Sequence, residues 1–341
     1  MSAERTAWQH RGMGTDFKFI LRSYKGDVAG FVDGTRWQLD EMDRAWSRFR
    51  GDSELSVLNK TKRVERPSPL FKLAMFEAAN AFRTTRGAFD PRVKSALTAL
   101  GYDVSFEKIG TGNEVGGRRQ PAFVEALPRA EKFSPIYDLQ ADALAAGDYE
   151  IDFGGIGKGL ALRLLSAHLR QNHAGSHLID AGGDIVTYLQ PPDDLPWYID
   201  IEHPLPALRL PILLRLGTRA VATSSTKIRT WKQDGVTKHH LIDPITMDSA
   251  ASDLCAVTVI DSDPARAEIY TKWIFLQGRQ RGLQLATNRK IAALIVDTGG
   301  QISYTAALGR FMEVQGNGAT VTQKVNHVEQ STQFWPISIS T

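Results

Sequence analysis

The segment Ile151–Leu165, IDFGGIGKGLALRLL, constrains the fold of this chain more than any other stretch. Its first residues are typical of a short apolar strand, and apolar residues at helical spacing follow Lys158. Glycine is unfavourable inside either element, so the four glycines must serve a sharp turn, close approach of the backbone to an anion, or packing. Lys158 lies near the expected start of the helix, where free N–H groups and the helix dipole favour an anion. The segment alone leaves two interpretations open, an anion-binding turn and a packing turn with a solvated lysine.

The glycine segment matches neither of the two common phosphate-binding motifs. It lacks the spacing and the Ser or Thr after the lysine that define a Walker A motif, and no G-x-G-x-x-G with a ribose-binding acid is present. A second double glycine, Gly182-Gly183, lies between two expected strands and predicts a bulge or close approach to a ligand. Residues 107–121 are also rich in glycine, but no helix signal follows at once, so we interpret them as a surface loop.

Strand and helix patterns mix along the chain without regular βαβ alternation, which favours an α+β fold with mixed or antiparallel sheets. Ser53 suits a helix start and Gly87 a helix end. Hairpins are expected around Asp234–Gly235 and over Ala292–Ser303. Expected strands are 13–22, 177–181, 184–189, 197–202, 211–216, 219–223 and AVTVI from Ala256; expected helices are 28–49, 69–86, 158–172 and a segment from Pro264 to about Gly278. We expect one domain over residues 9–308 and a polar tail over 309–341.

Composition excludes several classes of protein. The 341 residues are 42% hydrophobic and carry a net charge of +3, with basic and acidic residues interspersed, so no basic stripe indicates a nucleic-acid partner. The single cysteine, Cys255, excludes an internal disulfide framework and lies in an apolar run typical of a buried, inert thiol. No run approaches the roughly 20 apolar residues of a membrane span. We therefore expect a cytoplasmic protein, or a periplasmic one if an export signal has been removed.

Hydroxyl, imidazole and carboxylate side chains gather between Thr223 and Asp243. A Ser–His–Asp hydrolase is disfavoured, because no nucleophile elbow is present. His239 and His240 are adjacent at a strand start and should point to opposite faces, so at most one can share a site with Asp243. In GAFDP, Asp90 precedes a proline, which predicts either a stiff bend or a carboxylate directed at a ligand.

Taken in order, these segments resemble the ApbE family of flavin transferases, which move FMN from FAD onto a hydroxyl group of a recipient protein. The resemblance covers most of residues 9–305, and its specificity lies in the order of short motifs. The matching segments are Met13–Phe17, Ser47–Asn59, Gly87–Val93, Ile151–Gly159, Ala181–Ile185, Trp197–Pro204, Ala220–Ser225, His239–Thr246 and Ala256–Glu268.

The resemblance implies an α+β, T-fold-like architecture with FAD in a cleft and a magnesium ion near its pyrophosphate. It implies transfer of FMN to a Thr or Ser of a recipient flavoprotein with release of AMP, with His240 and Asp243 as candidates for the catalytic base. Carried over by position, the implied metal ligands are Gly157 through its carbonyl, Glu268 and Thr271. The implied cofactor-binding residues are Met13, Phe49, Ala88, Phe89, Asp90, Gly154, Gly157, Lys158, Leu160, Thr223, His240 and Ile242.

The chain departs from the family pattern at the implied metal site. Where the family has A-D-x-x-x-T, this chain has Glu268 in place of the Asp and Lys272 in place of the Thr. Thr271 lies one residue early, about 100° round a helix. An ammonium group at that position would repel a metal ion or replace its charge. Further departures are Arg163 for a common Asp, Ser225 for a Gly, and Met247 for the Gly that closes DPxTG.

Two readings of these departures follow. In one, the protein is a divergent transferase with rearranged metal geometry. In the other, it binds an FAD-like ligand without transferring FMN, and Lys272 takes over the charge of the ion. An unrelated enzyme or an interaction protein that reuses the fold is a third possibility.

Overall fold

An eight-stranded antiparallel sheet forms the centre of the computed structural model, which describes residues 5–22, 24–115, 133–192, 195–205 and 212–314. Every neighbouring pair of strands in the sheet is antiparallel, which confirms the α+β prediction. The strand order is β1 (Arg5–Gly12), β2 (Thr15–Arg22), β6 (His177–Ala181), β7 (Asp184–Tyr188), β10 (Arg219–Ser225), β15 (Leu254–Asp261), β16 (Ala292–Asp297) and β17 (Ile302–Tyr304).

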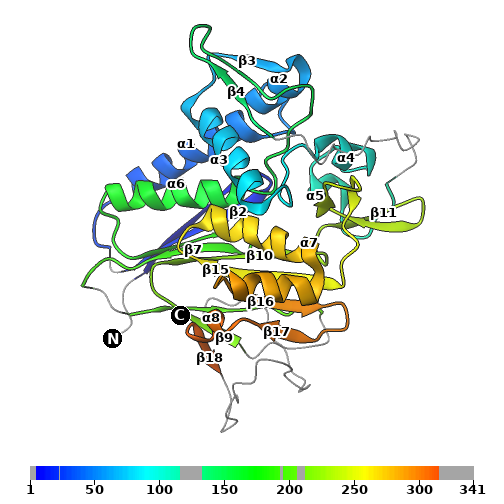
Figure 1. The fold of residues 1–341 in the computed structure, drawn as a ribbon. Helices are drawn as coiled ribbons and strands as arrows, with labels where there is room; N and C mark the ends of the chain where they lie inside the picture. The colour runs from blue at the N-terminus through cyan, green and yellow to red at the C-terminus, as the bar shows by residue number, and fades with distance from the viewer. Residues whose placement is uncertain (1–4, 23, 116–132, 193–194, 206–211, 315–341) are drawn as a thin grey trace.

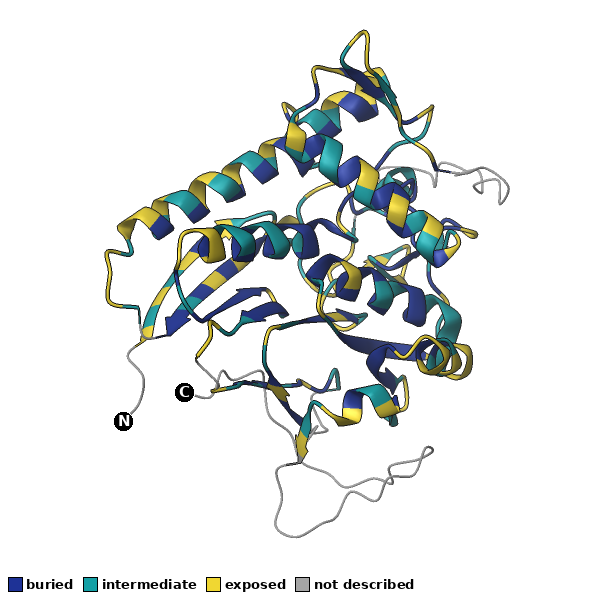
Figure 2. Ribbon diagram, turned by 60° about the vertical axis from the view of Figure 1, so that its left-hand side comes forward, coloured by how far each residue is buried: buried dark blue, intermediate teal, exposed yellow. Residues whose placement is uncertain are grey.

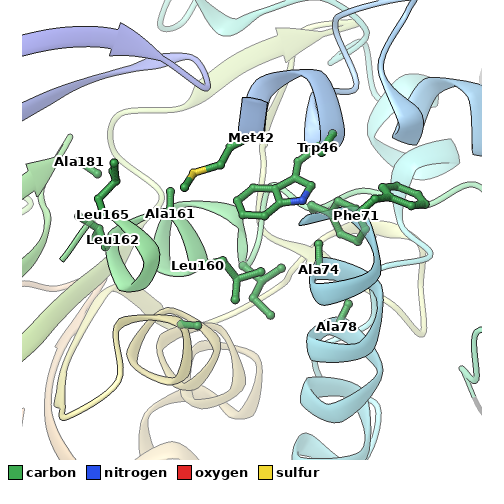
Figure 3. Close-up of a cluster of buried hydrophobic side chains, with 14 of the residues drawn as sticks. Met42, Trp46, Phe71, Ala74, Ala78, Leu160, Ala161, Leu162, Leu165 and Ala181 are labelled. Atoms are coloured by element: carbon green, nitrogen blue, oxygen red, sulfur yellow. The ribbon is translucent and has the colours of Figure 1, made fainter. Parts of the chain in front are cut away.

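Helices cover one face of this sheet in two layers (Figure 1). α6 (Gly157–Gln171) and α7 (Pro264–Asn288) lie on the strands. From outside, α1 (Ala29–Trp46) packs against α6, and α3 (Pro69–Thr85) packs against α1 and α7. Fully buried leucines of α6 meet Met42, Trp46 and Phe71 between the layers (Figure 3). Burial of such large side chains contributes about 1.5–3 kcal/mol each, so this core holds the start of α6 in place.

A smaller sheet covers the opposite face. It consists of β8 (Trp197–Asp200), β9 (Ile212–Leu216) and β18 (Met312–Val314), with α8 (Ala306–Gly309) beside it. Since β15 is covered on both sides, its residues are buried in succession rather than alternately (Figure 2). The prediction of a buried thiol is confirmed, because Cys255 is 1% exposed and burial raises its pKa to about 11.

Short elements surround the end of the sheet where α6 begins (Figure 1). The small strands are β3 (Arg63–Glu65), β4 (Ile136–Asp138), β5 (Ala143–Ala145), β11 (Thr230–Gln233), β12 (Val236–His239), β13 (Ile242–Asp243) and β14 (Asp248–Ser249). β3, β5 and β4 form a three-stranded sheet, which begins directly after α2 (Glu54–Thr61). α4 (Lys94–Ala99) and α5 (Phe106–Ile109) pack with the β11–β12 and β13–β14 hairpins. The predicted hairpin at Asp234–Gly235 is confirmed, because β11 pairs with β12 across it.

The predicted strand before the glycine segment is wrong. Residues 151–153 are extended but belong to no sheet. The side chain of Asn59 takes the place of a strand partner, since its amide donates to the carbonyl of Ile151 at 2.9 Å and accepts from the Ile151 N–H at 2.6 Å. An apolar run therefore indicated an extended backbone here, but it did not reveal what satisfies its hydrogen bonds.

Other departures from the predicted elements are local. Strand β1 was not predicted, although it alternates in exposure. The predicted glycine-rich loop begins inside the short helix α5, and its residues 116–121 lie outside the described residues. α7 has non-helical geometry at Gly278, with φ +69°, where the sequence predicts the helix to end, but helical structure continues beyond it. β18 lies within the range assigned to the tail, of which residues 315–341 lie outside the description.

Candidate functional site

A pocket opens at the N-terminal end of α6, between the glycine segment, the chain that follows α1 and the hairpins after β10. It contains most of the residues assigned to cofactor binding, although they come from five separate stretches of sequence. These residues are Met13, Phe49, Ala88, Phe89, Asp90, Gly154, Gly157, Lys158, His240 and Ile242. Lys272, which departs from the family pattern, also lines the pocket.

Three residues that the sequence assigned to the site lie outside the pocket lining, because the period of their helix or strand directs their side chains elsewhere. Leu160 is fully buried in the helical core. Thr223 shares the sheet face of Val221, which packs toward the smaller sheet, so its hydroxyl pairs with Thr258 rather than facing the helices. Thr271 is fully buried on α7, where its hydroxyl pairs with Ser224 at 2.6 Å.

The carboxylates of Glu268 and Asp243 are also absent from the lining. Glu268 lies behind the pocket and is 2% exposed. Asp243 caps its own hairpin, because its Oδ1 accepts from the Ile245 N–H at 2.9 Å and its carbonyl accepts from the Met247 N–H at 2.8 Å. Met247 completes that turn with φ +54°, a backbone conformation that favours glycine.

The glycine segment is a close-packed turn and helix start. The Gly154 N–H donates to Asp152 Oδ1 at 2.7 Å, which holds the turn. A Cβ built on Gly155 would lie 3.0 Å from the ring of Phe89 and 3.3 Å from Cε of Lys272. A Cβ built on Gly159 would lie 2.5 Å from Cα of Ala265. Two of the glycines therefore permit contacts that any side chain would block, one at the pocket wall and one between α6 and α7.

A buried charge cluster lies at the N-terminus of α6. Lys158 Nζ contacts the Asp184 carboxylate and lies 3.6 Å from Glu268 Oε1. Lys272 Nζ lies 3.3 Å from the same oxygen, while Glu268 Oε2 accepts from the Gly159 N–H at 2.8 Å. The anion at this helix N-terminus is thus a carboxylate of the protein itself, supplied by α7.

Burial and neighbouring charges shift the pKa values in this cluster. Desolvation lowers the pKa of Lys158 to about 8, with repulsion from Lys272 and Arg229 opposing the attraction of Glu268. Desolvation also lowers the pKa of Lys272, although Glu268 counteracts it. Burial alone would raise the pKa of Glu268, but the two ammonium groups outweigh it and lower that pKa. The cluster therefore favours an ionised glutamate between two amines, with Arg229 as a third cation on the pocket wall.

Aromatic rings and Arg48 form another part of the lining. The guanidinium of Arg48 lies 4.5 Å from the ring centroid of Phe49 and 4.2 Å from that of Tyr102. Its Nε lies 3.2 Å from Asp152 Oδ2, and both side chains are 7% exposed. Arg48, Tyr102 and Arg229 were missed by the sequence assignment of site residues. The burial of Arg48 against a carboxylate depends on tertiary pairing, which periodicity does not reveal.

His240 is the candidate base that reaches the pocket. Burial, followed by the charges of Arg229 and Lys272, holds its pKa well below the usual value. Its Nδ1 lies 3.4 Å from the Arg229 carbonyl, a contact suited to an Nδ1–H donor that leaves Nε2 free to accept a proton. His239 bonds the Ala250 carbonyl instead. The predicted place of the two histidines at a strand start is wrong, because His239 is the last residue of β12 and His240 follows the strand.

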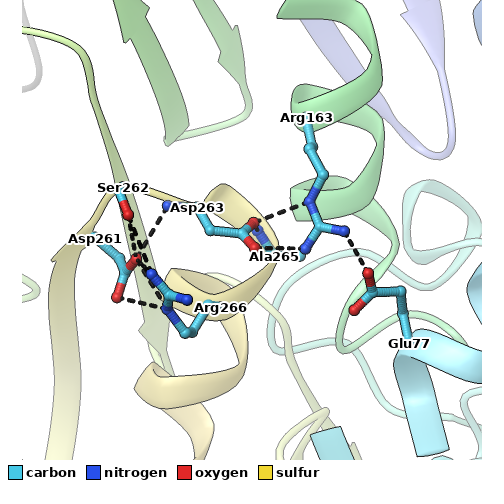
Figure 4. A network of polar contacts seen from close by, with 7 residues as sticks. All are labelled: Glu77, Arg163, Asp261, Ser262, Asp263, Ala265 and Arg266. Carbon is cyan, nitrogen blue, oxygen red and sulfur yellow. Dashed lines mark hydrogen bonds and ion pairs between the residues drawn. The ribbon is translucent and has the colours of Figure 1, made fainter. Parts of the chain in front are cut away.

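Arg163, another departure from the family pattern, lies outside the pocket lining. Figure 4 shows its side chain between Asp263 and Glu77. Its guanidinium forms a two-pronged pair with Asp263, through Nε to Oδ1 at 3.0 Å and Nη2 to Oδ2 at 2.6 Å. Nη1 donates to Glu77 at 2.5 Å. Arg163 therefore joins α6 to the start of α7 and to α3.

The described residues contain neither a metal-binding cluster of side chains nor a membrane-spanning helix. No group of at least three His, Cys, Asp or Glu side chains there is arranged to hold a metal ion. In that same part of the chain, no helix is long and apolar enough to cross a membrane.

The sequence is similar to the members of one known protein family. Residues 13–295 match a family model described as "ApbE family". The chain is 26% identical over 266 residues to the FAD:protein FMN transferase of Vibrio cholerae, with 76% of each chain covered. It is 23% identical over 271 residues to the FAD:protein FMN transferase of Haemophilus influenzae, with 76% of this chain and 75% of the relative covered.

Solved structures share the fold. A protein of Thermotoga maritima superposes with a TM-score of 0.78 at 24% identity, over 91% of this chain and 100% of that one. The apo flavinyl transferase of Pseudomonas stutzeri superposes with a TM-score of 0.75 at 21% identity, over 92% and 99% of the two chains. At these identities the structural likeness extends to the fold alone.

Proposed function

This chain belongs to the ApbE family, and on that premise we propose that it is an enzyme that binds FAD and transfers FMN to a Thr or Ser hydroxyl of a recipient protein. The observation that carries the proposal is the composition of the pocket. Aromatic side chains around Arg48 suit the planar rings of a dinucleotide, and the glycine turn with Lys158, Lys272 and Arg229 suits its pyrophosphate.

The proposed reaction is a phosphoryl transfer. The acceptor hydroxyl oxygen attacks the FMN phosphorus of FAD, a new P–O bond forms, and the bond to the AMP oxygen breaks, so AMP leaves. His240 is the proposed base, because its lowered pKa keeps the imidazole neutral and able to take the hydroxyl proton. Asp243 caps a turn, so the proposal assigns the proton to His240 alone. Lys158 and Arg229 would stabilise the charge on the pyrophosphate.

The predicted magnesium ligands do not fit a metal ion as they are arranged. Both carboxylate oxygens of Glu268 are already engaged, because Oε2 accepts from the Gly159 N–H and Oε1 faces the ammonium of Lys272. The Thr271 hydroxyl donates to the Glu268 carbonyl at 2.7 Å. Gly157 is the first residue of α6, where a carbonyl accepts from the helix itself. We therefore derive no step through a metal.

Mass spectrometry of a recipient peptide tests the proposed function. The protein is incubated with FAD and a peptide that carries an acceptor Thr, with the V. cholerae relative as the positive control. We expect a peptide enlarged by FMN, an equal amount of AMP, and loss of both products in a His240→Gln variant. If the relative modifies the peptide and this chain does not, the transfer reaction is contradicted.

A second candidate function is FAD binding without transfer. The position of Lys272 favours it, because an ammonium stands where the family pattern has a hydroxyl. Under this alternative the same incubation gives bound FAD but neither AMP nor modified peptide. The recipient protein and a cytoplasmic location remain predictions from the sequence.

A further inference from the structure

The carboxylate oxygens of Glu268 and Asp184, near the N-terminus of α6, already contact ammonium or N–H groups of the protein. Glu268 holds Gly159 with one carboxylate oxygen and faces Lys272 and Lys158 with the other. Asp184 contacts Lys158 with Oδ2 and accepts from the Thr223 N–H with Oδ1 at 2.9 Å. A divalent cation that prefers oxygen ligands would have to displace these groups.

Lys272 is held in a defined position at the pocket wall. It lies one helical turn after Glu268, whose carbonyl accepts from Nζ at 3.2 Å and whose Oε1 lies at 3.3 Å. Its aliphatic stem crosses the glycine turn, since Cε and Cδ lie 3.3 and 3.4 Å from the position of a Cβ on Gly155. The side chain is 16% exposed and lines the pocket, so Lys272 is anchored from behind by Glu268 and is accessible from the pocket.

We propose that the ammonium group of Lys272 is the built-in cation of this pocket and that it binds the pyrophosphate of FAD directly, so the nucleotide binds without a divalent metal ion. This inference rests on the proposed function and deepens it. An ammonium carries three N–H donors, of which two are directed at Glu268, and the third is available to a phosphate oxygen.

The neighbouring groups suit this role. Glu268 fixes the amine of Lys272 but is behind the pocket lining, so it does not face the ligand. Lys158 and Arg229 line the same pocket and add positive charge. Around the start of α6, the two ammonium groups of Lys158 and Lys272 face the two carboxylates of Glu268 and Asp184. Arg229 is near enough to lower the pKa of both lysines, and its charge is the excess that is left for an anion.

The test is the affinity for FAD, measured by fluorescence titration in EDTA and again in excess Mg²⁺. We expect the wild-type protein to have the same affinity in both, within about threefold. In EDTA, Lys272→Met should weaken FAD binding by at least about tenfold, whereas Lys272→Arg, which keeps the charge, should weaken it less. Riboflavin, which lacks phosphate, should bind both variants as it binds the wild type.

A matched control is Lys94→Met. Lys94 also pairs with a glutamate, Glu150 at 2.8 Å, and is 22% exposed, but it is not part of the pocket lining. The Lys94→Met variant should bind FAD with the affinity of the wild type. Thermal unfolding of each variant reports whether it is folded. If Lys272→Met does not fold, the inference is tested by the FAD affinity of the wild type in EDTA and in excess Mg²⁺.

Three results would overturn the inference. One is wild-type FAD binding that strengthens by more than about threefold with Mg²⁺. Another is a folded Lys272→Met variant that binds FAD as the wild type does. The third is no FAD binding at all, which overturns the proposed function as well, whereas the first two leave the transfer reaction standing.

Discussion

Among the four glycines of the segment, Gly159 lies closest to the backbone of α7. A Cβ there would lie 2.5 Å from Cα of Ala265 and 2.6 Å from the carbonyl oxygen of Pro264, both backbone atoms. The same close approach lets the carboxylate of Glu268 reach the Gly159 N–H. One glycine therefore determines both the packing of the two helices and the position of the charge cluster.

Replacing Gly159 by Ala should destabilise the fold although Ala is the better helix former. The backbone of α7 would have to move, and overpacking of this kind costs about 1–3 kcal/mol or more. Gly30→Ala is the matched control, because Gly30 also lies in a helix and a Cβ there meets nothing within 4 Å. It should stabilise by about 0.5–1 kcal/mol. Urea unfolding measures both, and equal effects of the two substitutions would contradict this assignment.

Residues of the pocket lining were predictable from sequence where a motif places a side chain on a loop or in the first turn of a helix. Phe89, Lys158 and His240 all line the pocket as assigned. The assignment failed where a side chain's direction depends on strand or helix phase, as at Thr223 and Leu160. One residue along a strand reverses the face, so a motif alone does not say which of two neighbours meets the ligand.

At the scale of elements, α6 is positioned by contacts at both its start and its middle. Glu268 of α7 accepts from its first turn, and Arg163 ties its middle to Asp263, the N-cap of α7, and to Glu77 of α3. The spans of α1, α3 and α6 were predictable to within a few residues, because apolar periodicity and terminal residues define them. Ser53 and Ser68 both accept from N–H groups of the helices that follow them. The cross-links between helices were not, because the partners lie far apart in sequence.

Arg163→Met should remove one of these cross-links without affecting the pocket. Its side chain is 29% exposed, so the loss of its charged hydrogen bonds should lower the free energy of unfolding by about 1–2 kcal/mol. Arg266→Met, which breaks a more exposed pair with Asp261, should cost less than about 1 kcal/mol. FAD affinity should be unchanged in both variants. A large loss of FAD affinity in Arg163→Met alone would show that this departure acts on the site.

At the scale of the whole molecule, the pocket exists only because the sheet and its helices bring distant segments together. Met13 reaches it from the β1–β2 turn, Arg48 from the end of α1, and Lys272 from α7. The order of motifs along the sequence indicated the family and its α+β fold. Glu268 and Lys272 pair one turn apart on α7, but sequence could not show that this pair would lie at the glycine turn, because its place there depends on the contact between α6 and α7 at Gly159.

The most direct test of the central claim, that this pocket binds FAD, is an FAD titration of the wild type and of Gly155→Leu. The added side chain would meet Phe89 and Lys272 at the pocket wall. Gly51→Leu is the control, since a Cβ there meets nothing within 4 Å. We predict saturable binding of one FAD per wild-type chain, unchanged affinity in the control, and affinity at least about tenfold weaker in Gly155→Leu. A wild type that does not bind FAD, or a folded Gly155→Leu variant that binds it equally well, would contradict the account.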